Sequence, residues 1–529
     1  MRFCNCSRKC KRGCFDPQLF LDKTPIEFVK EHKFLGLIWD CKLSFRAHVE
    51  YLKKRCMQAL QIIRVVAHSQ WGSDTKTLLR LFRSLVRSKL DYGSIVYMSG
   101  DERSLEKLNI VHRHGLRLCL GAFKSSPIEA LYAEANELPL ELRREELAMR
   151  YALKIKANPD NAVYNSIYKS PNEIKSEKSL GESISRLFDE AEINTDKITT
   201  SKIPDTPIWC SEPNEVSFKL SVYDKSTTNP DLFKSKFLSE VLPDYKDYFQ
   251  IYTDGSKQDE KAAFGVYLKP YGSLANSITH DSSIFTAELE GIKRAFQFIG
   301  DSQKSAGKNQ QHGKKFVIFC DSKSVLESIE NQSSKNPIMI DILDTLQKFK
   351  RSGFIIKFCW IPSHVGIRGN EIADQKAKGA LNNPPPAYHQ VPYSDYIPKV
   401  KTYIRKKWQK RWDNKHRARP IKLHEIMPVI RPFYLNGLAR KDEIKIHRLR
   451  IGHTRVTTKY LMERDQEPIC DNCNEDNPFT VKHILIECSD FEYIRQNYFR
   501  ATNMQDLFEG IPLGRIIGFL KKVNLYDKI

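Results

Sequence analysis

Apolar residues recur at helical spacing through the first third of the chain. One series runs from Val49 to Ile63, a second runs from Leu78 to Leu90, and further apolar positions continue to about residue 155. Repeats of three and four residues place such side chains on one helix face, which predicts an antiparallel helical unit. Before it, residues 33–45 carry two apolar runs around Asp40 and Lys42, a pattern typical of a hairpin that turns at those polar residues.

Periodicity is weak between residues 158 and 246, where Pro, Ser, Lys and Glu are frequent. This composition predicts a linker that contains one short amphipathic helix around Ile184, Leu187 and Phe188. No residues with recognisable chemistry stand out in the segment.

From residue 249 the pattern changes to short apolar runs, polar turns and longer helical stretches. The predicted strands are FQIYTDGS, AAFGVYL, SLANSITH, KFVIFCD and FIIKFCW, and FTAELEGIKRAFQFI is a predicted helix. Strands that alternate with helices predict an α/β domain with a mixed, five-stranded sheet and flanking helices. The polar stretch at about residues 301–314 is predicted to be a tolerated loop insertion.

The length of 529 residues is too great for one hydrophobic core, so several compact units are expected. Lys and Arg outnumber Asp and Glu by 85 to 64, and the formal net charge of +21 favours nucleic acid as the partner. No apolar run reaches the roughly 20 residues that span a bilayer, and no apolar signal core begins the chain. We therefore expect no membrane partner and an intracellular location, either nuclear or cytoplasmic.

Thirteen cysteines in an intracellular chain are expected to be reduced thiols, so clustered cysteines are better read as metal ligands than as disulfides. Cys4, Cys6, Cys10 and Cys14 do not match a common zinc module, and no apolar core follows them. Residues 1–24 are therefore predicted to be a disordered tail.

Four acidic residues fall where the predicted fold would bring them together: two end predicted strands, one opens the first predicted helix, and one lies on the last predicted helix. The four are Asp254, Glu288, Asp321 and Asp374. Such a group can hold two Mg²⁺ or Mn²⁺ ions, because hard cations take oxygen ligands and a pair of ions stabilises both the attacking and the leaving oxygen. His364 lies on a glycine-containing loop before the last helix, where it can carry a proton. Glu290, two positions beyond Glu288, is expected to point away around the helix.

The motifs YTDGS, TAELEGI, FCDSKSV and WIPSHVGIRGNEIADQKAKGA resemble those of the ribonuclease H family. The resemblance implies that Asp254, Glu288, Asp321 and Asp374 are metal-binding catalytic carboxylates, and that His364 assists deprotonation or product release. It favours Glu288 over Glu290, because Glu288 precedes Leu289 as the family pattern requires. The implied activity is endonucleolytic hydrolysis of the RNA strand of an RNA–DNA hybrid.

A strongly basic region follows, with 19 Lys and Arg against 4 Asp and Glu between residues 399 and 459. Basic and aromatic side chains together are typical of surfaces that contact phosphates and stack on bases. The candidate contacts are Lys406, Lys407, Trp408, Lys410, Arg411, Trp412, Arg448, Arg450 and Arg455. The alternative is structural, because Trp408 and Trp412 are four residues apart and can anchor a helix whose basic side is only solvated.

Near the end of the chain, Cys470, Cys473, His483 and Cys488 have the spacing C-x2-C-x9-H-x4-C. Four sulfur and nitrogen ligands suit a closed tetrahedral Zn²⁺ site. With no vacancy for water, the predicted zinc is structural and stabilises a small fold.

The order of these parts resembles the C-terminal end of a reverse transcriptase polyprotein from a non-LTR retrotransposon of the Jockey-like kind. The segments that carry the resemblance are KFLGLIWDCKLSF, WGSDTKTLLRLFRSLVRSKLDYGSIVY and RLRIGHTRVTTKYLM with the CCHC site. It implies that residues 25–157 are a primer-grip and thumb-like remnant, followed by a linker (158–246), a ribonuclease H domain (247–381), a basic region (382–460) and a zinc-binding tail (461–529).

Reverse transcriptases need a paired-Asp motif, and no Asp-Asp dipeptide occurs in this chain, so polymerase activity is not expected. The expected function is hydrolysis of RNA–DNA hybrids, with RNA and single-stranded DNA as further partners. The alternative is a catalytically idle remnant that binds nucleic acid.

Overall fold

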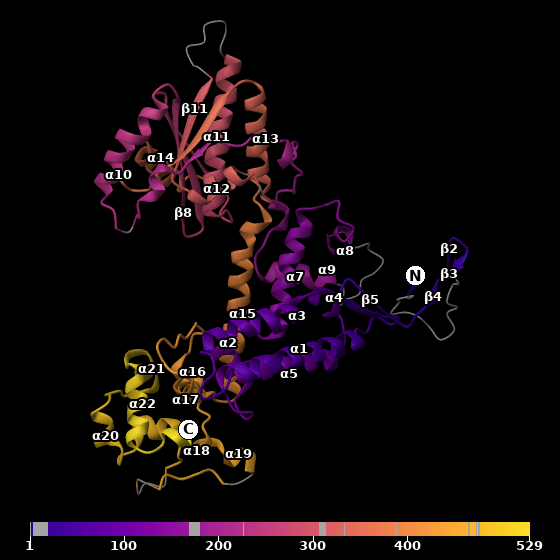
Figure 1. The fold of residues 1–529 in the computed structure, drawn as a ribbon, viewed down its shortest axis with the longest axis vertical. Helices are drawn as coiled ribbons and strands as arrows, with labels where there is room; N and C mark the ends of the chain where they lie inside the picture. The colour runs from indigo at the N-terminus through magenta and orange to yellow at the C-terminus, as the bar shows by residue number, and fades with distance from the viewer. Residues whose placement is uncertain are drawn as a thin grey trace. The chain divides into compact units, whose positions relative to one another are not determined.

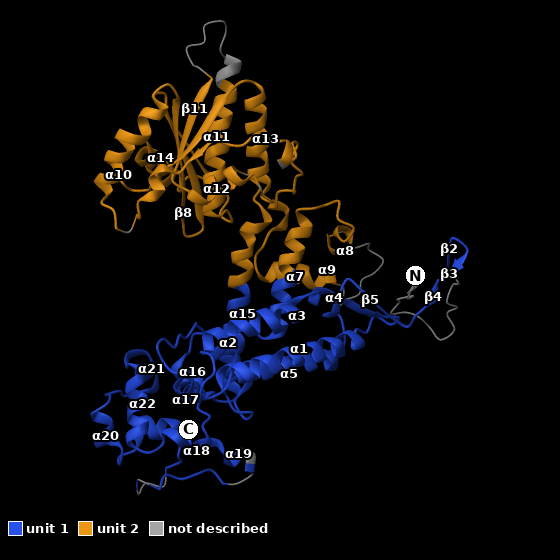
Figure 2. Cartoon of the chain, viewed as in Figure 1, with its two compact units in different colours: residues 1–148, 403–529 blue, residues 149–402 orange. Residues whose placement is uncertain are grey.

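The computed structural model describes residues 2–3, 19–168, 180–225, 227–305, 314–332, 334–386, 389–463, 466–471, 473 and 477–529. The chain forms two compact units, one of residues 1–148 with 403–529 and one of residues 149–402 (Figure 2). The N-terminal cysteines from Cys4 to Cys14 lie outside the described residues. Across the ranges that are described, no helix combines the length and the apolar character needed to cross a bilayer.

Residues 149–402 are built around one mixed sheet (Figure 1). Its strands, in spatial order, are β10 (Gly272–Ile278), β9 (Lys261–Leu268), β8 (Phe249–Gln258), β11 (Lys315–Cys320), β12 (Ile355–Trp360) and β7 (Val216–Ser217). The pairs β10–β9 and β9–β8 are antiparallel, and the remaining pairs are parallel. The predicted α/β fold is confirmed, but the sheet has six strands, because β7 pairs with β12 at the edge that a five-stranded sheet would leave open.

Helices pack on both faces of this sheet. They are α11 (Ile284–Ser305), α12 (Lys323–Asn331), α13 (Pro337–Arg351) and α14 (Arg368–Ala380). The strands contribute nearly continuous apolar runs to the core, with Val317, Ile318 and Phe319 of β11 completely buried. Such runs are expected for a strand that is covered on both faces.

The linker prediction is wrong for residues 216–245. This segment forms β7, α10 (Pro230–Lys236) and short helical turns, and its apolar side chains join the core of the sheet. The buried members are Leu220, Phe233, Phe237, Val241 and Tyr245. The last four of these recur every four residues, a helical spacing that the Pro-, Ser- and Lys-rich composition of the segment obscured. The predicted amphipathic helix is confirmed as α9 (Leu180–Glu190), where Ile184 and Phe188 are buried.

The other unit is mainly helical. Its N-terminal helices are α1 (Arg46–Val66), α2 (Thr75–Phe82), α3 (Ser88–Asp91), α4 (Ser94–Tyr97), α5 (Glu102–Leu120) and α6 (Ile128–Ala135), with α7 (Leu140–Lys156) following. The predicted hairpin is present as β5 (Glu31–Phe34) and β6 (Leu37–Asp40), but it turns at Leu35 and Gly36, both with positive φ. Asp40 instead accepts backbone N–H bonds from Ser44 and Phe45, just before α1 begins.

The C-terminal residues fold back onto this helical unit rather than forming separate successive domains. Helix α17 (Arg440–Ile451) packs against α5 and α6. The remaining helices of the region are α15 (Ile397–Ala418), α16 (Lys422–Ile426), α18 (Arg455–Thr458), α19 (Tyr460–Glu463), α20 (Glu492–Gln496), α21 (Met504–Gly510) and α22 (Leu513–Lys522). The boundaries expected at residues 382 and 460 therefore do not coincide with the compact units.

Candidate active site

Asp254 lies in the middle of β8, directly opposite Gly265 of β9. A side chain at Gly265 is excluded, because a Cβ there would lie 2.1 Å from the Ala373 carbonyl oxygen of α14. The glycine lets α14 pack directly on the strand pair, which brings Asp374 of the same helix to Asp254.

Glu288 reaches the same place from α11, on the opposite face of β8. Gly255 allows this approach, since a Cβ at this position would lie 2.8 Å from the Glu288 backbone nitrogen. Neighbouring residues of a strand face opposite sides of the sheet, so Asp254 meets α14 while Gly255 meets α11. Glu288 is buried, with 5% of its surface exposed, and its Oε2 lies 3.8 Å from Cys320 Sγ.

Asp321 is the first residue after β11, at the carboxyl end of the strand. Its backbone oxygen accepts a hydrogen bond from Trp360 Nε1 at 3.0 Å, which fixes the turn after the strand. Asn370 Nδ2 donates to Asp321 Oδ2 at 3.4 Å. Asn370 is buried at the start of α14, so the same helix that carries Asp374 also orients Asp321.

The electrostatics of the cluster reflect negative charge held together away from water. Burial, and then the neighbouring Asp321 and Asp374, raise the pKa of Asp254. Burial, Asp321 and Asp254 raise the pKa of Glu288 well above its ordinary value. These shifts show that the protein alone does not compensate the charge of the cluster, since like charges and desolvation both disfavour the ionised form.

The donor set fits divalent cations. Each of the four residues offers carboxylate oxygens, the ligands that Mg²⁺ and Mn²⁺ prefer, and bound cations would remove the repulsion that raises these pKa values. Within the described residues, Glu288 and Asp321 have ligand atoms within 4.8 Å of each other, and so do His364, Glu371 and Asp374.

His364 lies on the loop between β12 and α14, beside the cluster. Its side chain is 65% exposed, and its Nδ1 is 3.9 Å from Asp374 Oδ2. The residue has a left-handed backbone, with φ of 59°, which is uncommon for a residue with a side chain. Gly366 donates its N–H to Glu371 Oε1 at 3.2 Å and joins the loop to α14.

Lys378 and Asn370 also belong to the site, although the sequence motifs did not predict them. Lys378 Nζ donates to Asp374 Oδ2 at 2.7 Å, one helical turn away. The spacing of Asn370, Asp374 and Lys378, four residues apart on a predicted helix, is a signal that could have found them. Glu290 lies outside the cluster, at 3.7 Å from Lys293 and 3.8 Å from His389.

The C-terminal cysteines and histidine also come together. Cys470, Cys473, His483 and Cys488 are all buried, and their ligand atoms lie within 4.8 Å of one another. Cys470 Sγ is 3.9 Å from Cys488 Sγ, and Cys473 Sγ is 3.3 Å from His483 Nε2. A tetrahedral zinc with Zn–S bonds of about 2.3 Å requires an S–S separation of about 3.8 Å, so the arrangement fits Zn²⁺.

The expectation that the tryptophans of the basic region stack on bases is wrong. Trp408 and Trp412 are 3% and 1% exposed, and Trp412 Nε1 donates to the Met427 carbonyl oxygen at 3.2 Å. They anchor α15 in the helical unit, as the alternative structural interpretation predicts. A base-stacking role and a structural role predict the same spacing of the two tryptophans, so the sequence alone did not distinguish the two roles.

Several of the basic residues predicted to contact nucleic acid also have partners within the fold. Arg411 and Lys407 pair with Glu129 and Glu145, at 2.7 and 2.8 Å. Buried Arg450 donates to Glu134 at 2.9 Å. Arg448 donates to the backbone oxygens of Gly121 and Ile529, and burial lowers its pKa to about 10. Lys406, Lys410 and Arg455 remain exposed.

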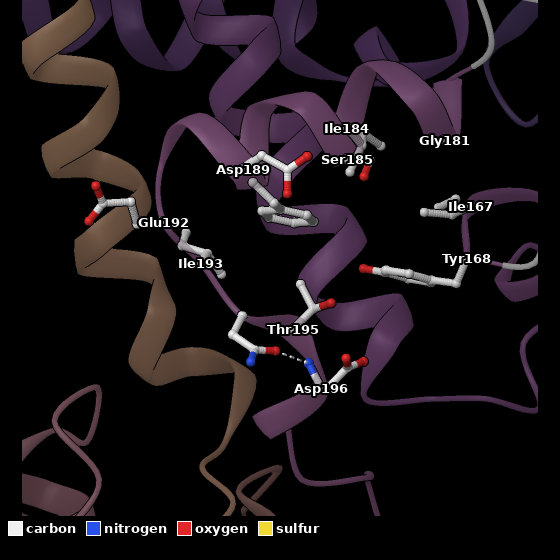
Figure 3. A pocket seen from close by; sticks show the side chains of 12 residues that line it. Ile167, Tyr168, Gly181, Ile184, Ser185, Asp189, Glu192, Ile193, Thr195 and Asp196 are labelled. Atoms are coloured by element: carbon white, nitrogen blue, oxygen red, sulfur yellow. Dashed lines mark hydrogen bonds between the residues drawn. The ribbon is translucent and has the colours of Figure 1, made fainter.

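A separate cavity of about 540 Å³ lies against α9 (Figure 3). Its lining combines apolar side chains such as Ile184 and Phe188 with Asp189 and the loop at Asn194, which accepts the Asp196 backbone N–H at 2.9 Å. Its described lining includes no histidine, cysteine, lysine or arginine, so the carboxylate cluster is the stronger candidate for catalysis.

Comparison with known proteins defines the class. Residues 246–382 match the family model described as RNase H. Together with the mixed sheet, the match identifies this segment as an RNase H domain. Part of the chain is similar to two solved structures: RNase H1 from the halophilic archaeon Halobacterium salinarum NRC-1 and LC11-RNase H1 in complex with an RNA/DNA hybrid. They are 18% and 17% identical, cover 26% and 25% of this chain and 99% of their own chains, and each has a TM-score of 0.21.

The chain is also similar to two Pol polyproteins of Nasonia vitripennis, from the type-1 retrotransposable elements R1 4 and R1. Identity is 24% over 144 residues and 27% over 119 residues, which cover 27% and 22% of this chain. The matches span 37% and 35% of the relatives, just over a third of their length. They support the predicted resemblance to a non-LTR retrotransposon polyprotein, as a similarity over part of this chain.

Proposed function

We propose that this chain hydrolyses the RNA strand of RNA–DNA hybrids with two divalent cations, Mg²⁺ or Mn²⁺. The observation that carries the proposal is the convergence of Asp254, Glu288, Asp321 and Asp374 from four different elements of the RNase H domain. A buried cluster of carboxylates without compensating positive charge lowers the stability of the fold. Such a cost is expected where the carboxylates bind the cations that catalysis needs.

The four carboxylates would hold the cations. When bound, these would activate water and stabilise the leaving oxygen. In the hydrolysis, the water oxygen bonds to phosphorus and the P–O3′ bond breaks, leaving a 5′-phosphate and a 3′-hydroxyl. Asn370 keeps Asp321 oriented, and Lys378 limits the movement of Asp374. His364, which lies exposed beside Asp374, would carry away the proton that the water loses.

The test is cleavage of a labelled RNA–DNA hybrid by the full chain in Mg²⁺ or Mn²⁺, with duplex DNA as the negative substrate. Asp254→Asn keeps the shape of the side chain and removes a charge, so cleavage should fall by at least ~100-fold while hybrid binding survives. Asp259→Asn, in the exposed turn after β8, is the matched control. An uncut hybrid, or full activity of Asp254→Asn, would favour an idle binding remnant.

We also propose that Cys470, Cys473, His483 and Cys488 bind one structural Zn²⁺. The four ligands satisfy a tetrahedral site and leave no position for a reacting water. The role of the ion would be to hold the C-terminal segment together, because the surrounding core is small.

A further inference from the structure

The RNase H domain of this chain receives side chains from a segment that precedes the matched residues 246–382. Residues 216–245 lie against it through β7 and through buried Leu220 and Phe233, each 1% exposed. These two anchors fix both ends of the stretch between them. Lys225 lies between these two anchors and Lys234 directly follows the second, so both lysines are held near the sheet.

Two lysines of this segment lie beside the loop that carries His364. Lys225 Nζ donates to Ser363 Oγ, the hydroxyl next to His364. Lys234, on α10, lies under the same loop, since a Cβ built on Gly366 would be 3.5 Å from Lys234 Cδ and 3.9 Å from its Nζ. Both lysines are exposed. Two positive charges from different elements thus flank one loop.

We propose that Lys225 and Lys234 form a phosphate-binding rim, which holds the backbone of the nucleic-acid substrate next to the carboxylate cluster. The inference rests on the proposed function and extends it to substrate positioning. A cluster of four carboxylates repels a polyanion, so cations at its edge lower the cost of bringing a phosphate close.

Lysine suits this role because its ammonium is a mobile point charge on a flexible stem. The Ser363 hydroxyl that Lys225 contacts is a weak partner that a phosphate oxygen can replace. The rim and the carboxylates would then contact different phosphates, since the rim lies on the His364 side of the cluster.

The experiment compares Lys225→Gln/Lys234→Gln with Lys315→Gln in the full chain. Lys315 is an exposed lysine at the opposite end of β11 from Asp321, so it controls for the loss of charge. Binding of a fluorescent RNA–DNA hybrid is measured across a salt series in an Asp254→Asn background, which prevents hydrolysis. The double variant should lower the slope of log affinity against log salt by about 2, one for each phosphate contact, whereas Lys315→Gln should not.

A second measurement locates the contacts. Hybrids with a single neutral methylphosphonate are compared, moving the linkage along each strand. At the phosphate that a lysine contacts, the neutral linkage should weaken binding of the parent chain but not of the variant that lacks that lysine.

In steady-state cleavage, the double variant should raise KM on the order of tenfold and leave kcat nearly unchanged. A salt slope equal to that of Lys315→Gln would overturn the proposal. A fall in kcat with an unchanged slope would also overturn it, because the lysines would then only hold the His364 loop. If the parent chain cuts no hybrid, the proposed function fails, and the salt slope still decides the role of the lysines.

Discussion

Asp395 fastens the start of the helix that carries Glu288, although it lies outside the matched RNase H segment. Its Oδ2 accepts hydrogen bonds from the Thr286 hydroxyl at 2.6 Å and from the Ser283 backbone N–H at 2.8 Å. A carboxylate at this position satisfies a free N–H and interacts favourably with the positive end of the helix dipole. Segments on both sides of residues 246–382 therefore support the carboxylate cluster.

We expect Asp395→Asn to lower the stability of the sheet-containing unit by about 1 kcal/mol, because the cap loses its charge. It should also raise the Mg²⁺ concentration needed for half-maximal cleavage, since Glu288 lies two residues beyond Thr286. Denaturant unfolding and a metal titration measure the two effects. Asp395→Glu should partly rescue the metal dependence, and an unchanged titration for Asp395→Asn would show that the cap does not position Glu288.

His364→Ala should slow kcat by about 10- to 100-fold, less than Asp254→Asn, because water can partly replace an exposed proton carrier. KM should change little, since His364 is not expected to hold the substrate. Steady-state cleavage of a hybrid gives both values. His280→Ala, which removes another exposed histidine of the same unit, is the control. A rate equal to that of the parent chain would exclude His364 from the reaction.

The carboxylates were predictable because each one lies in or directly after a strand or helix whose own pattern is clear in the sequence. Lys225 and Asp395 were not, because their positions depend on how irregular segments pack against the sheet. The sixth strand of the sheet was not predicted either, because β7 has only two residues, too few to show an alternating pattern.

The basic region shows a different limit of sequence reasoning. Charge composition correctly marked it as unusual, yet it did not show which cations have acidic partners. Arg411 pairs with Glu129 and Arg450 pairs with Glu134, although the partners are hundreds of residues apart in the chain. Only the tertiary fold decides between such ion pairs and free phosphate-binding charges.

The chain should retain about one equivalent of zinc after extensive dialysis, measured by elemental analysis of carefully reduced protein. Cys473→Ser removes one of four ligands and should lose the metal together with part of the thermal stability. Cys210→Ser, which changes an exposed cysteine, should retain both. Absence of zinc from the reduced parent protein would remove the site.

The exposed lysines of α15 remain candidates for nucleic-acid contact in the basic region, together with Arg455. Lys406→Gln/Lys410→Gln should reduce the salt slope of hybrid or single-strand binding by about 2. Arg411→Gln should instead leave the slope unchanged and lower stability by about 1 kcal/mol, since it breaks the pair with Glu129. If the lysine pair leaves the slope unaltered, the exposed face of α15 is only solvated.

The helical unit should lose stability in mild acid because of His112. This side chain is completely buried between Phe82 and Tyr132, and neither ring nitrogen has a hydrogen-bond partner among the described residues. Burial, followed by the charges of nearby arginines, lowers the pKa of His112 from 6.5 to about 3.

A histidine whose pKa is lowered by folding takes up its proton more readily in the unfolded state. The unfolded state is therefore favoured progressively as the pH falls from about 6.5 towards 3, and His112 should cost about 2 kcal/mol at pH 5 relative to neutral pH. His112→Phe keeps an aromatic ring in the stack and should remove this part of the pH dependence. His68→Phe, at an exposed position, should not. Denaturant unfolding at pH 7 and pH 5 tests the difference, and an identical loss of stability in His112→Phe and the parent chain would contradict it.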